Sequence, residues 1–204
     1  MQIKVCGMRD PEQIRHLQKF SVDWMGLIFY PESPRYVGDE FSLADEHIAT
    51  IKTGVFVDAP IHWLMQKIAQ VPLDAVQLHG NETTAYCSAI GERNVIVIKA
   101  FAVDEQFNFE KIVPYTEFTD YFLFDTKTKM KGGSGKKFDW TVLKNYNLDH
   151  PFFLSGGIAP EDAKIIQQLE LHNLFGIDIN SKFEFTPADK NLQQVEEFIQ
   201  KIKI

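Results

Sequence analysis

Short apolar runs recur along the chain and alternate with stretches in which apolar residues return every three or four positions. Runs rich in β-branched and aromatic residues predict strands. Several are almost continuously apolar, such as the run at 121–124, which is typical of parallel strands covered on both faces. Eight strands are predicted, at 3–6, 24–30, 54–58, 75–79, 95–100, 121–125, 152–155 and 174–179.

The stretches between these runs show helical periodicity. Asp10 is a suitable N-cap before Pro11, and Gly91 is a usual helix stop. The patterns predict helices at 11–20, 61–70, 82–90, 160–169 and 192–202, and less regular ones at 43–51, 106–113 and 139–145. Alternating strands and helices imply a parallel sheet. Eight such units predict an α/β fold, a (β/α)8 TIM barrel formed as a single domain by residues 1–204, with an open doubly wound sheet as the alternative.

Composition narrows the classes of partner. The 204 residues carry a net charge of −7, which argues against nucleic acid as the main partner but leaves room for a small anionic substrate. Two cysteines do not suggest a disulfide framework, and no apolar run approaches the roughly 18 residues of a membrane span. The N-terminal residues resemble a strand rather than a signal peptide. We therefore expect a cytoplasmic protein that binds neither nucleic acid nor membrane.

Polar and reactive residues gather where the predicted strands end. In a (β/α)8 barrel the functional site forms at these C-terminal ends. The residues at or near the strand ends are Cys6, Asp58, Gln77, His79, Lys99, Asp125, Ser155, Gly156, Gly157, Asp178, Asn180 and Ser181. Strand ends also meet loops, where polar residues are common, so each residue alone has a structural explanation. Their joint occurrence on most strands favours a site.

Two of these residues have distinct interpretations. A free cysteine near a strand end, such as Cys6, is usually a small buried hydrophobe. Asp125 directly follows an apolar run, and a poorly solvated carboxyl favours the protonated form that a general acid needs. Cys87 lies within a predicted helix, where the structural interpretation is kept.

Glycines occupy positions that suit a phosphate ligand. Gly156 and Gly157 allow close approach of the backbone, and the next residues begin a predicted helix whose N–H groups attract anions. Phosphate sites in these barrels commonly use the loops after strands 7 and 8, which here include Ser181. The segment 131–136, Lys-Gly-Gly-Ser-Gly-Lys, lacks the Walker A spacing; it is either a surface loop or, from its place next to Asp125, a lid.

Several motifs together resemble the phosphoribosylanthranilate isomerase family. They are Lys-Val-Cys-Gly-Met at 4–8, Ser-Pro-Arg at 33–35, Gly-Val-Phe-Val at 54–57, Val-Gln-Leu-His-Gly at 76–80, Phe-Asp at 124–125, Gly-Gly-Ser-Gly at 132–135, Phe-Asp-Trp at 138–140 and Ser-Gly-Gly-Ile at 155–158. The matches follow in order along almost the whole chain.

The resemblance implies the third step of tryptophan biosynthesis, an Amadori rearrangement of the phosphorylated sugar N-(5′-phosphoribosyl)anthranilate that needs no cofactor and no metal. Cys6 would be the general base and Asp125 the general acid. Arg35 would bind the anthranilate carboxylate and Asp178 would face the substrate amine. Gly156, Gly157, Asn180 and Ser181 would form the phosphate end. His79 is a candidate for substrate binding, with a purely structural histidine as the alternative.

The strand 8 loop departs from the family pattern. Where the family usually has Ser-Ser-Gly-Val-Glu, this chain has Asn-Ser-Lys-Phe-Glu at 180–184, so that Lys182 replaces a glycine, and Ala188 replaces another. The alternatives are a related sugar isomerase of histidine biosynthesis, against which Cys6 argues, and a phosphate-binding barrel without catalysis. A monomer is expected, with a dimer as the alternative.

Overall fold

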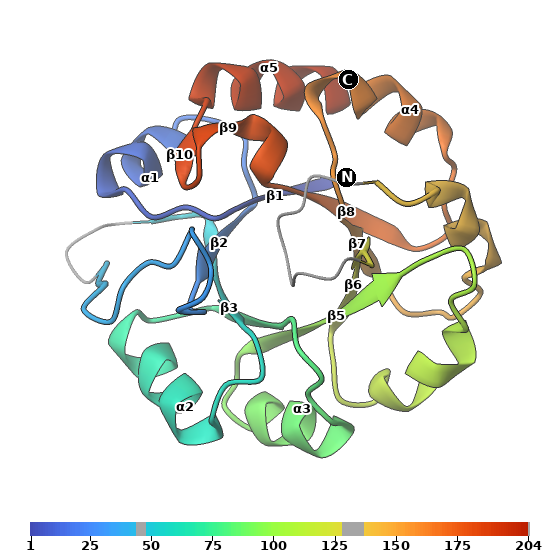
Figure 1. Ribbon diagram of the computed structural model, residues 1–204, viewed down its shortest axis with the longest axis horizontal. Coiled ribbons are helices and arrows are strands. Elements are labelled where there is room, and N and C mark those ends of the chain that lie inside the picture. Colours follow the sequence, from blue (N-terminus) through green and yellow to red (C-terminus); the bar gives the residue numbers. More distant parts are fainter. Residues whose placement is uncertain (44–47, 128–136, 204) are drawn as a thin grey trace.

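The computed structural model describes residues 1–43, 48–127 and 137–203. Eight parallel strands close into a barrel, and helices surround it (Figure 1). The strands are β1 (Gln2–Cys6), β2 (Trp24–Ile28), β3 (Ile51–Phe56), β4 (Ala75–Leu78), β5 (Ile96–Val103), β6 (Tyr121–Thr126), β7 (Phe152–Leu154) and β8 (Leu174–Ile179). The predicted TIM barrel is confirmed, and the open sheet is wrong because β1 pairs with β8.

The helical elements differ in length and type. The α-helices are α1 (Pro11–Leu17), α2 (Ile61–Gln70), α3 (Thr84–Gly91), α4 (Ala163–Gln168) and α5 (Leu192–Ile202). The 3-10 helices are η1 (Phe109–Tyr115), η2 (Trp140–Asn145), η3 (Pro160–Asp162) and η4 (Ser181–Phe183). In Figure 1, α5 lies between α1 and α4. No helix in the described part of the chain is long and apolar enough to cross a membrane.

Local capping explains where several helices begin. The Asp10 side chain accepts a hydrogen bond of 2.8 Å from the Glu12 N–H, as predicted for the N-cap of α1. The helix α3 begins at Thr84, two residues after the predicted start, and its N-cap is Thr83, because the Glu82 carboxylate binds other backbone groups. The Glu82 carboxylate accepts hydrogen bonds from the backbone N–H groups of Asp58 and Gly80.

Other predicted bounds need correction. The helix predicted at 43–51 partly falls outside the described residues; residues 48–50 are not helical, and Ile51 already begins β3. The helices predicted at 106–113 and 139–145 are the short 3-10 helices η1 and η2, and η1 contains Pro114, which cannot donate to a helical ladder. The helix predicted at 160–169 is divided into η3 and α4.

Two apolar shells alternate along the strands. One set of side chains faces the helices, and the other points into the barrel. The barrel interior nearer the N-terminal ends of the strands is filled by an apolar layer of Trp24, Ala75, Ile98, Ala100, Leu123 and Phe153. Nearer the C-terminal ends of the strands, a second interior cluster consists of Cys6, Ile28 and Val55. The interior is thus packed at one end and leaves room for polar side chains at the other.

Candidate functional site at the mouth of the barrel

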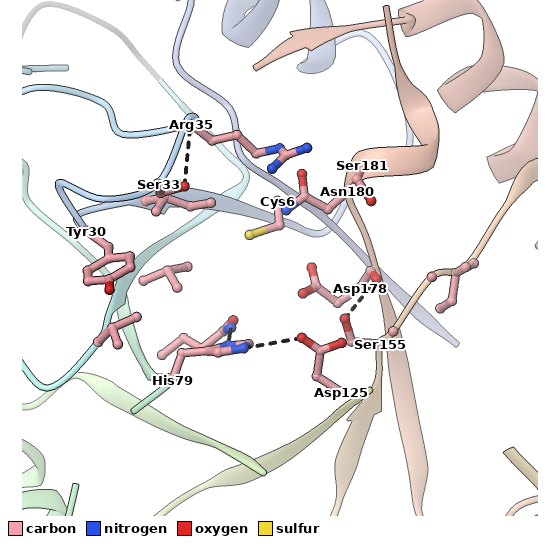
Figure 2. Close-up of a pocket in the computed structure, with 17 residues that line it drawn as sticks. Cys6, Tyr30, Ser33, Arg35, His79, Asp125, Ser155, Asp178, Asn180 and Ser181 are labelled. Atoms are coloured by element: carbon pink, nitrogen blue, oxygen red, sulfur yellow. Dashed lines mark hydrogen bonds and ion pairs between the residues drawn. The ribbon is translucent and has the colours of Figure 1, made fainter. Parts of the chain in front are cut away.

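A cavity opens at the C-terminal ends of the strands and encloses about 750 Å³, counting its open mouth. Its lining consists of Cys6, Ile28, Tyr30, Ser33, Arg35, Val55, Val57, Gln77, His79, Asp125, Ser155, Gly156, Gly157, Ile158, Asp178, Asn180 and Ser181 (Figure 2). The nine residues predicted for catalysis and substrate binding are all in this set.

Cys6 lies at the end of β1 with its sulfur directed into the cavity (Figure 2). It pairs with Gly26 across β1 and β2, and a Cβ atom on Gly26 would lie 2.6 Å from the sulfur. Gly26 therefore leaves the space that the thiol occupies. Burial raises the pKa of the Cys6 thiol, and the charge of Lys4 offsets part of this rise.

Asp125 faces His79 across the cavity (Figure 2). The Asp125 Oδ2 atom lies 3.3 Å from His79 Nε2, and His79 Nδ1 lies 2.8 Å from the Gln77 side-chain amide. Both ring nitrogens of His79 thus have partners, which fixes the plane of the ring. His79 therefore has structural partners and also lines the cavity. The second carboxylate of the cavity, Asp178, binds Lys4 Nζ at 2.9 Å.

Arg35 reaches the cavity from the segment after β2, and its guanidinium is held by a carboxylate. Its Nε atom lies 2.9 Å from Glu184 Oε2, and its Nη2 atom lies 2.7 Å from the same oxygen. Glu184 also binds Lys190 Nζ at 2.6 Å, and that ammonium lies 2.8 Å from Asn180 Oδ1. Glu184 begins β9 (Glu184–Thr186), which forms a hairpin with β10 (Asp189–Lys190). The hairpin therefore sets the direction in which Arg35 points.

The glycine pair after β7 lies beside the loop after β8. Gly156 and Gly157 have φ angles of 90° and 67°, which favour glycine. A Cβ atom on Gly156 would lie 2.8 Å from the backbone nitrogen of Thr126, so a side chain does not fit. The helix start at this place was predicted to offer free N–H groups to an anion. One of them is already bound, because the Ala159 N–H donates to the Asp162 carboxylate at 2.7 Å.

Some predicted residues lie elsewhere. Lys99 is in the middle of β5 and its ammonium points outward to Glu82, 3.1 Å away. Asp58 also does not line the cavity. Lys182 lines a second, outer cavity together with Lys137 and Glu161, so its charge is not directed into the central one. The segment 131–136, predicted as a loop or lid, lies outside the described residues.

Tyr30, Ser33 and Val57 also line the cavity, although the sequence pattern did not predict them. The pattern assigned no role to Lys4 or Glu184. Tyr30 and Val57 lie in or next to predicted strands, and their pattern does not distinguish lining residues from core. The available signal for Lys4 was its place as the one charged residue in the otherwise apolar predicted strand 3–6. Within the described ranges, no group of three His, Cys, Asp or Glu side chains is arranged to hold a metal ion.

Comparison with known proteins shows to which family the chain belongs. The model of N-(5′-phosphoribosyl)anthranilate (PRA) isomerase matches residues 3–201. The chain belongs to this family. It is 43% identical over 206 residues to the N-(5′-phosphoribosyl)anthranilate isomerase of Parabacteroides distasonis, covering 99% of this chain and 93% of that protein. The resemblance of the sequence motifs is thereby confirmed, and the histidine-pathway alternative is not supported.

Solved structures of this isomerase family have the same fold. One, in complex with reduced 1-(o-carboxyphenylamino)-1-deoxyribulose 5-phosphate, is 30% identical with a TM-score of 0.84 and covers 100% of this chain and 98% of its own. Another, of monomers generated from the dimeric isomerase of Thermotoga maritima, is 31% identical with a TM-score of 0.84 and the same coverage. The similarity extends over the whole barrel.

Proposed function

We propose that this chain catalyses the Amadori rearrangement of N-(5′-phosphoribosyl)anthranilate to 1-(2-carboxyphenylamino)-1-deoxyribulose 5-phosphate, the third step of tryptophan biosynthesis. The observation that carries the proposal is the convergence of Cys6 and Asp125 in one cavity of a chain that belongs to this family. A thiol and a carboxyl supply the base and the acid that the reaction needs. Residues 1–204 would act as one catalytic domain.

In the first step, Asp125 donates a proton to the furanose ring oxygen. The C1′–O bond breaks, and the nitrogen lone pair forms a C=N bond with C1′. The positive charge on this Schiff base acidifies the C2′ proton. Asp178 faces the amine side of the substrate, where an anion stabilises that charge.

In the second step, the Cys6 thiolate removes the C2′ proton. The C–H electron pair forms a C1′=C2′ double bond and the C=N electrons return to nitrogen, which gives an enolamine. Tautomerisation yields the ketone, so C2′ is oxidised and C1′ is reduced within one molecule. No external oxidant or reductant takes part in this balance, and neither a cofactor nor a metal has a step in it.

The remaining lining residues would hold the two ends of the substrate. Arg35 would bind the anthranilate carboxylate with the guanidinium edge that Glu184 does not cover. Gly156, Gly157, Asn180 and Ser181, from the loops after β7 and β8, would surround the phosphate. His79 would hold the Asp125 carboxyl in its direction.

The proposal is tested by following consumption of fluorescent phosphoribosylanthranilate. Wild type should turn over, and Cys6→Ser and Asp125→Asn should each lower kcat by roughly a hundredfold or more. Cys87→Ser is the matched control, because Cys87 is the other buried thiol and lies outside the cavity. Absence of turnover in wild type would refute the isomerase function, and tight binding without turnover would favour the binding-barrel alternative.

The proposal extends to the cellular location and the oligomeric state of the protein. The two free cysteines suit a reducing compartment, so we place the activity in the cytoplasm. We expect a monomer, whereas the Thermotoga maritima relative is described as dimeric. Light scattering of the purified protein across a tenfold concentration range decides between one and two copies.

A further inference from the structure

A buried ammonium group lies directly beneath the proposed base. Lys4 precedes Cys6 by two positions on β1, so both side chains point into the barrel. Lys4 has no exposed surface, and its Nζ atom lies 2.9 Å from Asp178 Oδ1. Lys4 and Cys6 are successive inward-facing residues of β1, so the ammonium that pairs with Asp178 belongs to the neighbour of the thiol on the same strand face.

The other charged groups near Cys6 leave Lys4 as its principal cation. Lys190 of β10 also lies nearby, but Glu184 binds its ammonium at 2.6 Å. The titratable and charged groups that face Cys6 from the surrounding elements are Lys4 of β1, Asp178 of β8, Lys190 of β10 and, around the cavity, Arg35, His79 and Asp125.

The energetics favour a fixed counter-charge at this place. Burial raises the pKa of Cys6, and among the nearby charges Lys4 has the largest opposing effect. Burial alone would lower the pKa of Lys4, but Asp178 and Cys6 outweigh it and raise the pKa above its ordinary value. The ammonium therefore keeps its proton while the thiol gains or loses one.

We propose that the Lys4 ammonium is the counter-charge that holds the Cys6 thiolate inside the barrel, and that Lys4 is thereby a positioning residue for the base. The inference rests on the proposed role of Cys6. In the reaction the thiolate takes the C2′ proton and becomes a thiol, while Lys4 transfers no proton. Without Lys4, the thiolate and the Asp178 carboxylate would face each other with no cation between them.

The test measures the thiol without substrate, so that it is independent of turnover. Iodoacetamide alkylation of Cys6 is followed by peptide mass spectrometry from pH 7 to 12 in wild type, Lys4→Met and Asp178→Asn. Cys87 is an internal control, because burial raises its pKa to about 11 and it lies in the outer shell. Lys203→Met, which removes a surface lysine paired with Asp23 at 3.0 Å, is the matched variant.

Lys4→Met should raise the midpoint of Cys6 alkylation by about one pH unit or more, and Asp178→Asn should lower it. The acid limb of kcat/KM should move with the midpoint in Lys4→Met. General loosening of the barrel would instead expose the thiol and lower the midpoint in both variants. Shifts in the same direction, or a shift in Lys4→Met below about 0.3 unit, would overturn the proposal. If Lys4→Met does not fold, Lys4→Gln is measured in its place, and a midpoint that does not rise in Lys4→Gln overturns the proposal.

If wild type shows no turnover but the midpoints move in opposite directions, the proposed function fails and the electrostatic role of Lys4 stands. If turnover is normal and the midpoints do not move, only the role of Lys4 fails. The two results are distinguishable because alkylation and turnover are measured separately.

Discussion

Replacing Gly26 with alanine would test how closely the barrel wall sets the position of Cys6. The new Cβ atom would lie 2.6 Å from the Cys6 sulfur and 3.0 Å from the Cys6 Cα atom. Ordinary contacts between such atoms are about 3.5 to 4.0 Å, so the two strands must separate or the thiol must move by roughly 1 Å. A side-chain rotation of Cys6 alone does not suffice, because the backbone is also too close.

The magnitude follows from this misfit. Overpacking of a core costs about 1 to 3 kcal/mol of folding free energy, and a displacement of about 1 Å at a reacting group costs roughly a hundredfold in rate. We expect Gly26→Ala to lose about 2 kcal/mol in urea unfolding and about a hundredfold in kcat, with a smaller change in KM. Combining it with Cys6→Ala should recover part of the lost stability, because the shortest contact disappears.

Gly91→Ala is the matched control. It adds the same methyl group to the last residue of α3, where the nearest neighbour outside the helix, a methyl of Val97, is 4.0 Å away. Its stability and kcat should stay at or slightly above wild type, since alanine favours a helix. Retention of kcat within threefold of wild type in Gly26→Ala, with unchanged stability, would refute the assignment of Gly26 as the residue that makes room for the thiol.

Three further predictions concern charge and backbone. Although burial opposes it, pairing with Arg35 and Lys190 lowers the pKa of Glu184 below its ordinary 4.5, so its contribution to stability exists above pH 4.5 and is lost as the pH falls through the folded-state pKa. Thermal melts should therefore show Glu184→Gln about 3 kcal/mol less stable at pH 7, and the difference from wild type should narrow in acid; a constant difference contradicts this. Arg35→Lys should raise KM about tenfold in the fluorescence assay, because a lysine cannot bind Glu184 and a substrate carboxylate with one planar fork; an unchanged KM would show that Arg35 does not meet the substrate. Glu170, exposed at φ 48° after α4, should gain about 1 kcal/mol in urea unfolding when changed to glycine but not to alanine, and equal effects of the two changes would exclude backbone strain as the cause.

The barrel was predictable because its strands are short apolar runs with few polar interruptions. Errors occurred where local pattern and tertiary structure disagree. β5 continues to Val103, beyond the predicted 100, because its last residues pair with β6. The segment containing Pro114 is apolar at helical spacing, yet it forms only a 3-10 helix. The hairpin of β9 and β10 was not predicted, since its strands are only a few residues long.

The lining of the site was predictable from the rule that barrel strands present their C-terminal ends to one mouth. The charge pairs behind that lining were not. Arg35 and Glu184 are 149 residues apart in the chain, and no local pattern indicates their contact. The position of Lys4 beneath Cys6 follows from alternation on β1, but its pairing with Asp178 requires the register in which β1 meets β8.

The register between β1 and β8 links the surroundings of Cys6 to the closure of the barrel during folding. Lys4 and Asp178 are direct partners across the seam between the first and last strands, so the pair forms only when the ring closes. During synthesis the first strand emerges long before the last, and in any open intermediate the ammonium beneath Cys6 lacks its carboxylate. A chain interrupted before β8 would have the cysteine but not the electrostatic setting that surrounds it. The electrostatic setting of Cys6 is therefore complete only when β1 and β8 have paired.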